Sequence, residues 1–108
     1  DERGDNVWDT PHKVIHVLCS PRATGPWSEI AEPATPRLTE GPILFRRGNL
    51  WTMFYDHFME GFFGAVESED GKTWRDITGQ IEFPPGPRHA SVLEVSDEIA
   101  AGLRALIR

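Results

Sequence analysis

The sequence is poor in several features that mark common protein classes. It has a single cysteine, Cys19, which excludes an internal disulfide and a cysteine metal cluster. No apolar run reaches the roughly 18–20 residues that a membrane-spanning helix needs. Basic residues are also few, because 11 Lys and Arg stand against 17 Asp and Glu, which gives a net charge of −6. This charge argues against nucleic acid or an anionic membrane as a partner.

The start of the chain also lacks a signal-peptide pattern. Residues 1–5 are mostly charged and no apolar stretch follows them. We therefore expect a soluble protein, and its compartment stays open because one cysteine does not decide it.

What is present is enough for one small folded domain. The 108 residues include 39% hydrophobic and 10% aromatic side chains, as expected of a folded chain. Ten Gly and nine Pro divide it into short pieces. Their spacing and the β-branched and aromatic runs predict strands at 13–20, 27–30, 43–47, 50–58, 62–68, 73–78 and 89–95. A helix is predicted from about 97 to the end, capped by Ser96.

The middle of the chain has the clearest pattern. Gly48 and Asn49 form a two-residue turn that favours a hairpin, because both tolerate positive φ. The returning strand at 50–58 is apolar on both faces, which predicts that it lies between two layers. Four consecutive antiparallel strands joined by tight turns are typical of one propeller blade.

A weak internal repeat points the same way. Trp27 and Trp74 are 47 residues apart, as are Ile30 and Ile77, and both Trp residues follow a strand and a glycine turn. This spacing is close to the ~40–50 residue period of propeller blades, although chance is the alternative. In a repeat, each Trp would fill the space between neighbouring blades.

The predicted fold class is therefore all-β, with about two four-stranded antiparallel propeller blades and a short C-terminal helix. The predicted organisation is an N-terminal arm at 1–12, a partial blade and connecting loop at 13–40, a complete blade at 41–78, a loop and strand of a further blade at 79–96, and the helix at 97–108. Closed propellers need about four to eight blades. Either other blades of a longer chain or several copies of this one must therefore cover the open faces.

An ordered set of motifs supports a family resemblance. In sequence order they are Thr-Glu-Gly-Pro at 39–42, the hairpin with Trp51 and Tyr55-Asp56, Gly-Ala-Val-Glu-Ser at 64–68, Trp-Arg-Asp-Ile at 74–77 and Arg-His-Ala-Ser-Val-Leu at 88–93. Together they resemble the C-terminal part of the five-bladed β-propeller glycoside hydrolases of family 43, the arabinofuranosidase and β-xylosidase group.

The resemblance implies an inverting hydrolase with Glu40 as the general acid. It also implies that His89 lies near the propeller axis, where it helps to hold water or one calcium ion. Arg88, next to His89 in the chain, could face the sugar pocket. The family's general-base Asp and its second, pKa-tuning Asp have no convincing counterpart here. Asp9 is a weak candidate for the base because its flanks lack the expected strand.

Inversion explains why one glutamate is not enough. An acid must protonate the leaving oxygen while a base activates water, with the carboxyl groups ~6.5–9.5 Å apart. The acid must also keep its proton near neutral pH, which requires burial or a neighbouring negative charge. The chain as it stands thus carries about half of a site.

Each candidate residue also has a simpler interpretation. Glu40 could be a loop carboxylate or a turn cap, and His89 a hydrogen-bonded structural histidine. Asp56 could bind a sugar hydroxyl or cap a turn, and the residues alone do not decide between these roles. Aromatic side chains could stack on sugar rings, but in a strand apolar on both faces a core role is favoured. These aromatics are Trp51, Phe54, Tyr55, Phe62 and Phe63.

The remaining histidines and one turn are interpreted as structural. His12, His16 and His57 lack the spacing of a zinc site and are expected to be structural or exposed. Asp70-Gly71 resembles a blade turn in which the aspartate binds backbone groups.

The leading hypothesis is a glycoside hydrolase-like propeller fragment. It would hydrolyse arabinofuranosyl or xylosyl bonds with inversion, provided that other blades or subunits complete the site. The rival is a catalytically inert unit that self-assembles and at most binds carbohydrate. A small sandwich domain with no sugar role is a third possibility.

Overall fold

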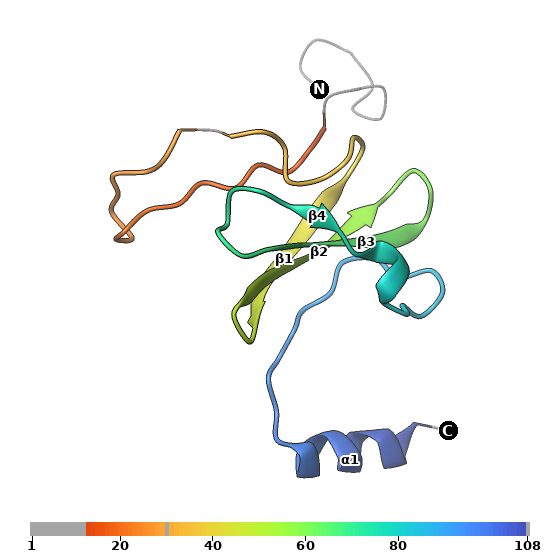
Figure 1. Ribbon diagram of the computed structural model, residues 1–108. Helices are drawn as coiled ribbons and strands as arrows, with labels where there is room; N and C mark the ends of the chain where they lie inside the picture. The colour runs from red at the N-terminus through yellow and green to blue at the C-terminus, as the bar shows by residue number, and fades with distance from the viewer. Residues whose placement is uncertain (1–12, 30, 108) are drawn as a thin grey trace.

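The computed structural model describes residues 13–29 and 31–107. Its centre is one four-stranded antiparallel sheet with the order β1-β2-β3-β4 (Figure 1). The strands are β1 (Glu40–Arg47), β2 (Leu50–His57), β3 (Phe62–Ser68) and β4 (Arg75–Asp76). A short 3-10 helix, η2 (Thr78–Gln80), follows the sheet, and α1 (Asp97–Leu106) ends the described chain. Neither helix is long and apolar enough to cross a membrane.

The hairpin predicted around Gly48-Asn49 is confirmed. Arg47 pairs with Leu50, so the turn contains only these two residues, and Gly48 has φ +63°. The prediction that the second strand has two covered faces is also confirmed, because adjacent residues of β2, Thr52 and Met53, are both buried. The all-β class follows from four strands joined mainly by short turns.

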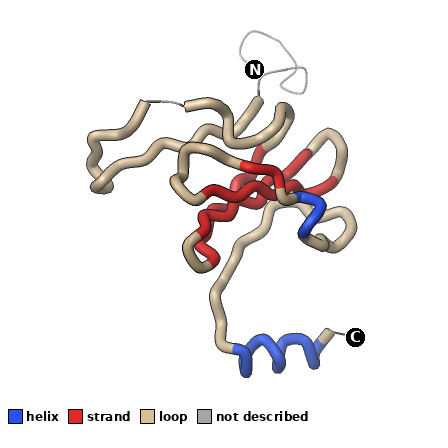
Figure 2. Tube along the Cα trace, in the orientation of Figure 1, coloured by secondary structure: helices blue, strands red, loops and turns tan. Residues whose placement is uncertain are grey.

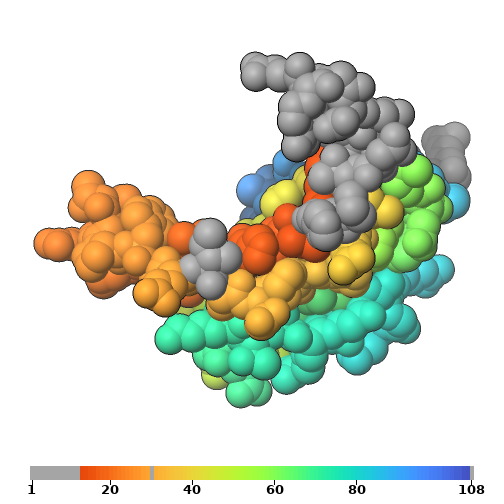
Figure 3. Space-filling model, turned by 90° about the horizontal axis from the view of Figure 1, so that it is seen from above, coloured from red at the N-terminus to blue at the C-terminus, as the bar shows by residue number. Residues whose placement is uncertain are grey.

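One face of the sheet carries the main apolar core. Met53, Tyr55 and Val66 form it together with Ala34, which comes from the loop before β1. Ile15, Val17 and Trp74 pack against this core as partly buried side chains. The covering layer is therefore the segment before β1, whose orange part projects sideways beyond the rest of the chain (Figure 3).

The opposite face carries a second aromatic cluster. Phe54 makes edge-to-face contacts with Phe45 and Phe83, each with ring centroids 5.0 Å apart. Phe63 also contacts Phe83, at 5.6 Å. Phe83 belongs to the segment after η2, so this segment lies over the second face of the sheet and places the residues that follow it near β1 and β2.

Three predicted strands are not formed. Segments 13–20 and 89–95 and the described part of 27–30 have no strand structure, so one sheet stands where about two blades were expected. Segment 13–19 makes only scattered backbone bonds, such as Ala34 N–H to Ile15 O, because Pro33 and Pro36 lack the N–H that a ladder needs. In segment 89–95, Leu93 is 82% exposed. A segment rich in β-branched residues becomes a strand only when the edge of a sheet is available to pair with it.

The structure treats the two halves of the sequence repeat differently. Trp74 packs against the core and Ile77 is buried, whereas Trp27 is 58% exposed. Ile30 lies outside the described residues. Trp27 therefore does not fill a packed space as a blade-filling residue would.

The turn after β3 forms as predicted. Asp70 Oδ1 accepts the backbone N–H groups of Lys72 and Thr73 and contacts the Ser68 hydroxyl. These donors, Thr73 first, hold the pKa of Asp70 below its ordinary value. Asp70 is thus structural, because its carboxylate binds the backbone of its own turn.

The C-terminal helix begins where the sequence predicts. Ser96 caps it by accepting the Ile99 N–H, and the acidic first turn suits the helix dipole. A long loop carries α1 away from the sheet (Figures 1 and 2). Its apolar stripe of Ile99, Leu103 and Leu106 is consequently exposed.

Candidate functional site

A bulge in the edge strand sets the position of Glu40. Ile43 of β1 pairs with Phe54 of β2, but Glu40 pairs with Asp56, so β1 has one extra residue over this stretch. The extra residue lies in Gly41-Pro42, and an edge strand tolerates a proline there because no partner needs its missing N–H. The bulge brings Glu40 directly opposite Asp56.

Gly41 allows the His89 side chain to approach the start of β1. It has φ +58°, and a Cβ built on it would lie 3.1 Å from atoms of the His89 imidazole. A larger residue would be strained and would push this ring away. The glycine of the Glu-Gly-Pro motif is therefore what lets His89 lie against the start of β1.

Arg88 links the two carboxylates. Its Nε donates to Asp56 Oδ2 at 2.8 Å, and a terminal guanidinium nitrogen lies 3.6 Å from Glu40 Oε1. Asp56 is completely buried, and its other oxygen, Oδ1, has no hydrogen-bond partner among the described residues. A buried carboxylate oxygen without a donor is costly, so the burial of Asp56 depends on the charge-assisted hydrogen bond that Arg88 donates to Oδ2.

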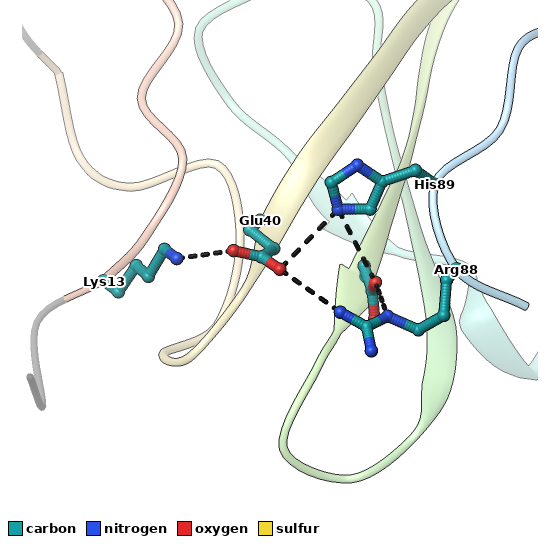
Figure 4. Close-up of polar contacts among 5 residues, drawn as sticks. Lys13, Glu40, Arg88 and His89 are labelled. Atoms are coloured by element: carbon teal, nitrogen blue, oxygen red, sulfur yellow. Dashed lines mark hydrogen bonds and ion pairs between the residues drawn. The ribbon is translucent and has the colours of Figure 1, made fainter. Parts of the chain in front are cut away.

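His89 completes the cluster. Its Nε2 lies 3.6 Å from Glu40 Oε1 and 3.9 Å from Asp56 Oδ2. Figure 4 shows the Arg88 and His89 side chains reaching from the last loop toward Glu40. We call Glu40, Asp56, Arg88 and His89 the carboxylate cluster. It combines three separate parts of the chain, namely β1, β2 and the loop after η2.

Lys13 also contacts this cluster, and sequence reasoning missed it. Its ammonium lies 2.5 Å from Glu40 Oε2 (Figure 4). This hydrogen bond is the main cause that lowers the pKa of Glu40 below its ordinary value. No local signal marks Lys13, because it lies 27 residues before Glu40 and only the fold brings the two together.

The short distance between the carboxylates limits what they can do. One carboxylate oxygen of Glu40 and one of Asp56 lie within 4.8 Å of each other. An inverting acid and base stand ~6.5–9.5 Å apart because a water and the sugar must fit between them. Asp56 is thus too close to Glu40 to be the missing general base, and its contact with Arg88 indicates a supporting role.

The calcium ion expected near His89 stays a prediction. Calcium takes six to eight oxygen ligands, whereas this cluster offers one imidazole nitrogen and two carboxylates. Arg88 and Lys13 already lie against these carboxylates. The donor set therefore fits calcium poorly, and we derive no chemistry through an ion.

The other predicted site residues lie elsewhere. Trp51 is half-buried near the far end of the hairpin, where the Arg46 guanidinium lies 4.8 Å from its ring. Strand alternation places Trp51 on the opposite face of β2 from Asp56, so the fold does not bring it to the cluster. Asp9 and His12 lie outside the described residues. His57 contacts the rings of Tyr55 and Phe62, in line with its expected structural role.

Beside the cluster lies an apolar hollow of about 170 Å³. Its lining includes Phe54, Phe63 and Phe83, together with Pro87 and Ala90, which flank Arg88 and His89 in the chain. The charged cluster and a nonpolar surface are thus adjacent on one face of the sheet, a combination that small-molecule sites commonly have.

The lowered carboxyl pKa values predict acid sensitivity. The Thr78 hydroxyl and N–H lower the pKa of Asp76, as the contacts above do for Glu40 and Asp70. Such groups stabilise the fold above their unfolded pKa values, about 4, and this stabilisation is lost as pH falls through the lower folded values. Urea unfolding at stepped pH should therefore show a falling free energy of unfolding between about pH 4 and pH 2. A flat profile over that window would contradict the assignment.

Comparison with protein-family models, curated protein sequences and solved structures finds no significant match to this chain.

Proposed function

We propose that the carboxylate cluster is the acid half of a glycosidase site, on a sheet that is one blade of a β-propeller resembling the family 43 glycoside hydrolases. The observation that carries the proposal is the meeting of Glu40 with Arg88 and His89. The resemblance implies a role in one pocket for Glu40 and His89, and Arg88 is next to His89 in the chain. The chain separates Glu40 from the other two by more than 40 residues, yet their side chains lie within ion-pair distance.

In this proposal each residue has a role, and the ion pair of Glu40 with Lys13 must open before Glu40 can serve as the acid. Glu40 protonates the leaving oxygen of an arabinofuranosyl or xylosyl bond. Arg88 is held by Asp56 and presents its free N–H groups to sugar hydroxyls, since more than half of the Arg88 side chain is exposed. Asp56 is buried beneath the pocket and contributes to sugar binding by orienting the Arg88 guanidinium. Other blades or subunits supply the general base.

A second candidate function is carbohydrate binding without catalysis by a unit that assembles with further copies. Three observations favour it for the chain taken alone. Among the described residues no second carboxylate of the cluster stands at the inverting distance from Glu40, and Lys13 engages Glu40 as an ion pair. The exposed apolar stripe of α1 and the exposed Leu93 are surfaces that assembly would cover.

Sugar binding tests the part that both candidates share. We expect xylo- or arabino-oligosaccharides to bind the chain in calorimetric titrations, and Arg88→Met to weaken binding about 10- to 100-fold, the value of lost charge-assisted hydrogen bonds. Arg104→Met is the matched control, because Arg104 lies in α1, away from the cluster.

Two results would count against this proposal. One is no heat with any of these sugars at millimolar concentration. The other is equal loss of affinity in the Arg88 and Arg104 variants, which would show that the cluster has no special part in binding.

A further inference from the structure

Lys13 is attached to the start of β1 through both its backbone and its side chain. Its carbonyl oxygen accepts the N–H groups of Leu38 at 2.7 Å and Thr39 at 3.3 Å. Leu38 has φ +59°, an uncommon value for leucine that this turn requires. The two backbone bonds hold Lys13 next to Glu40 whatever its side chain does.

The Lys13 side chain has little freedom to point elsewhere. Its ammonium is 4.7 Å from the centre of the Phe58 ring while it contacts Glu40 Oε2. A cation over an aromatic face is attracted to the ring. Only about a third of the Lys13 side chain is exposed.

Lys13 is the cation most closely associated with Glu40. Arg88 directs its Nε to Asp56 at 2.8 Å, and its nearest nitrogen is 3.6 Å from Glu40. His89 Nε2 is also 3.6 Å away. Asp56 is the acidic group of the cluster that faces Glu40 from β2. Both oxygens of Glu40 are thus engaged, Oε2 by Lys13 and Oε1 by Arg88 and His89.

We infer that Lys13 is a positioning residue of this site, which holds the Glu40 side chain as an ion-paired carboxylate turned toward the segment before β1. The inference rests on the proposed function for its catalytic meaning, because an acid must carry a proton and the neighbouring ammonium favours the ionised form of Glu40. Withdrawal of the ammonium therefore makes Glu40 a better proton donor. Lys13 thus restrains the acid until ligand or a neighbouring element replaces its contact.

The test is a pH titration of glutamate side-chain carboxyl carbons by NMR, with the Glu40 signal assigned by its loss in Glu40→Gln. We expect the pKa of Glu40 to rise in Lys13→Met and to stay near its wild-type value in Lys13→Arg. Lys72→Met is the matched control, because Lys72 lies in the turn after β3 and its side chain has no contact with Glu40. A merely structural lysine would change stability without moving this pKa specifically.

The inference is overturned if Lys13→Met leaves the Glu40 pKa unchanged or if Lys72→Met moves it equally. If Lys13→Met does not fold, the wild type is titrated in low and in 1 M salt. Salt screens a partly exposed ion pair, so the Glu40 pKa must rise, and an unchanged value overturns the inference. These readouts need neither sugar nor turnover. Failure of the proposed function would instead appear as absent sugar binding with the Lys13 effect intact.

Discussion

Gly64→Ala is expected to cause the largest loss of stability of any single methyl addition at a strand glycine. Gly64 lies in β3 opposite Tyr55 of β2. A Cβ at this position would be 2.4 Å from two carbons of the Tyr55 ring and 2.5 Å from its hydroxyl oxygen. Tyr55 is fully buried in the core with Met53 and Val66, so the ring has no space into which it can move.

The expected cost is at or above the upper end of the roughly 1–3 kcal/mol that overpacking usually costs. That is a large share of the stability of a small domain. Urea unfolding followed by tryptophan fluorescence measures it. Gly79→Ala is the matched control, because no atom lies within 4 Å of its added Cβ, and we expect a change within about 0.5 kcal/mol.

The Tyr55 contact itself can be checked by a second substitution. Tyr55→Leu removes the ring, so adding it to Gly64→Ala should cost less than adding it to the wild type. Equal urea midpoints for Gly64→Ala and Gly79→Ala would show that the Gly64–Tyr55 contact does not limit the packing of this sheet.

Glu40→Gln is expected to have the largest effect on activity. In a protein whose other blades or subunits complete the proposed site, loss of the general acid should lower kcat for arabinofuranosides or xylosides about 10²- to 10⁴-fold. Glutamine has nearly the same shape and can still accept a hydrogen bond from Lys13, so the fold should be retained. From the 108-residue chain alone we expect no turnover, because the cluster lacks a base at the required distance.

Glu60→Gln is the control for this comparison. Glu60 lies in the exposed turn between β2 and β3, so its substitution removes the same charge away from the cluster. Rates are measured with an aryl glycoside, whose good leaving group needs less acid assistance, and with an oligosaccharide, which needs more. Activity on the oligosaccharide that survives Glu40→Gln would remove Glu40 from the mechanism.

The turns and the order of the strands from β1 to β4 could be predicted because their signals are local. The extent of the fourth strand could not, because β4 covers only Arg75–Asp76 of the expected 73–78 and η2 follows it. Gly48-Asn49 and Asp70-Gly71 specify turns through the backbone angles and hydrogen bonds that they permit, and the aromatic run of β2 specifies a strand covered on both faces. Ser96 likewise marks the start of α1 through one hydrogen bond to its own first turn. None of these features needs a distant partner.

The strands expected at 13–20 and 89–95 do not form, because a strand also needs a distant partner. Their β-branched residues show a preference for extended backbone, but pairing depends on which sheet edge lies nearby. Segment 13–19 lies over the core face and bonds to a proline-interrupted loop. Segment 89–95 follows η2 across the second face and pairs with no edge among the described strands.

The carboxylate cluster likewise depends partly on local sequence and partly on long-range packing. The resemblance indicates Glu40 and His89, with Arg88 next to His89. The residues alone leave Asp56 open between two roles, and they do not show that Trp51 lies on the face of β2 opposite Asp56. Residue types and turn chemistry thus settle local structure and the inventory of reactive groups. The bulge at Gly41-Pro42, the burial of Asp56 and the contact of Lys13 with Glu40 follow from long-range packing, because each depends on atoms that are distant in sequence.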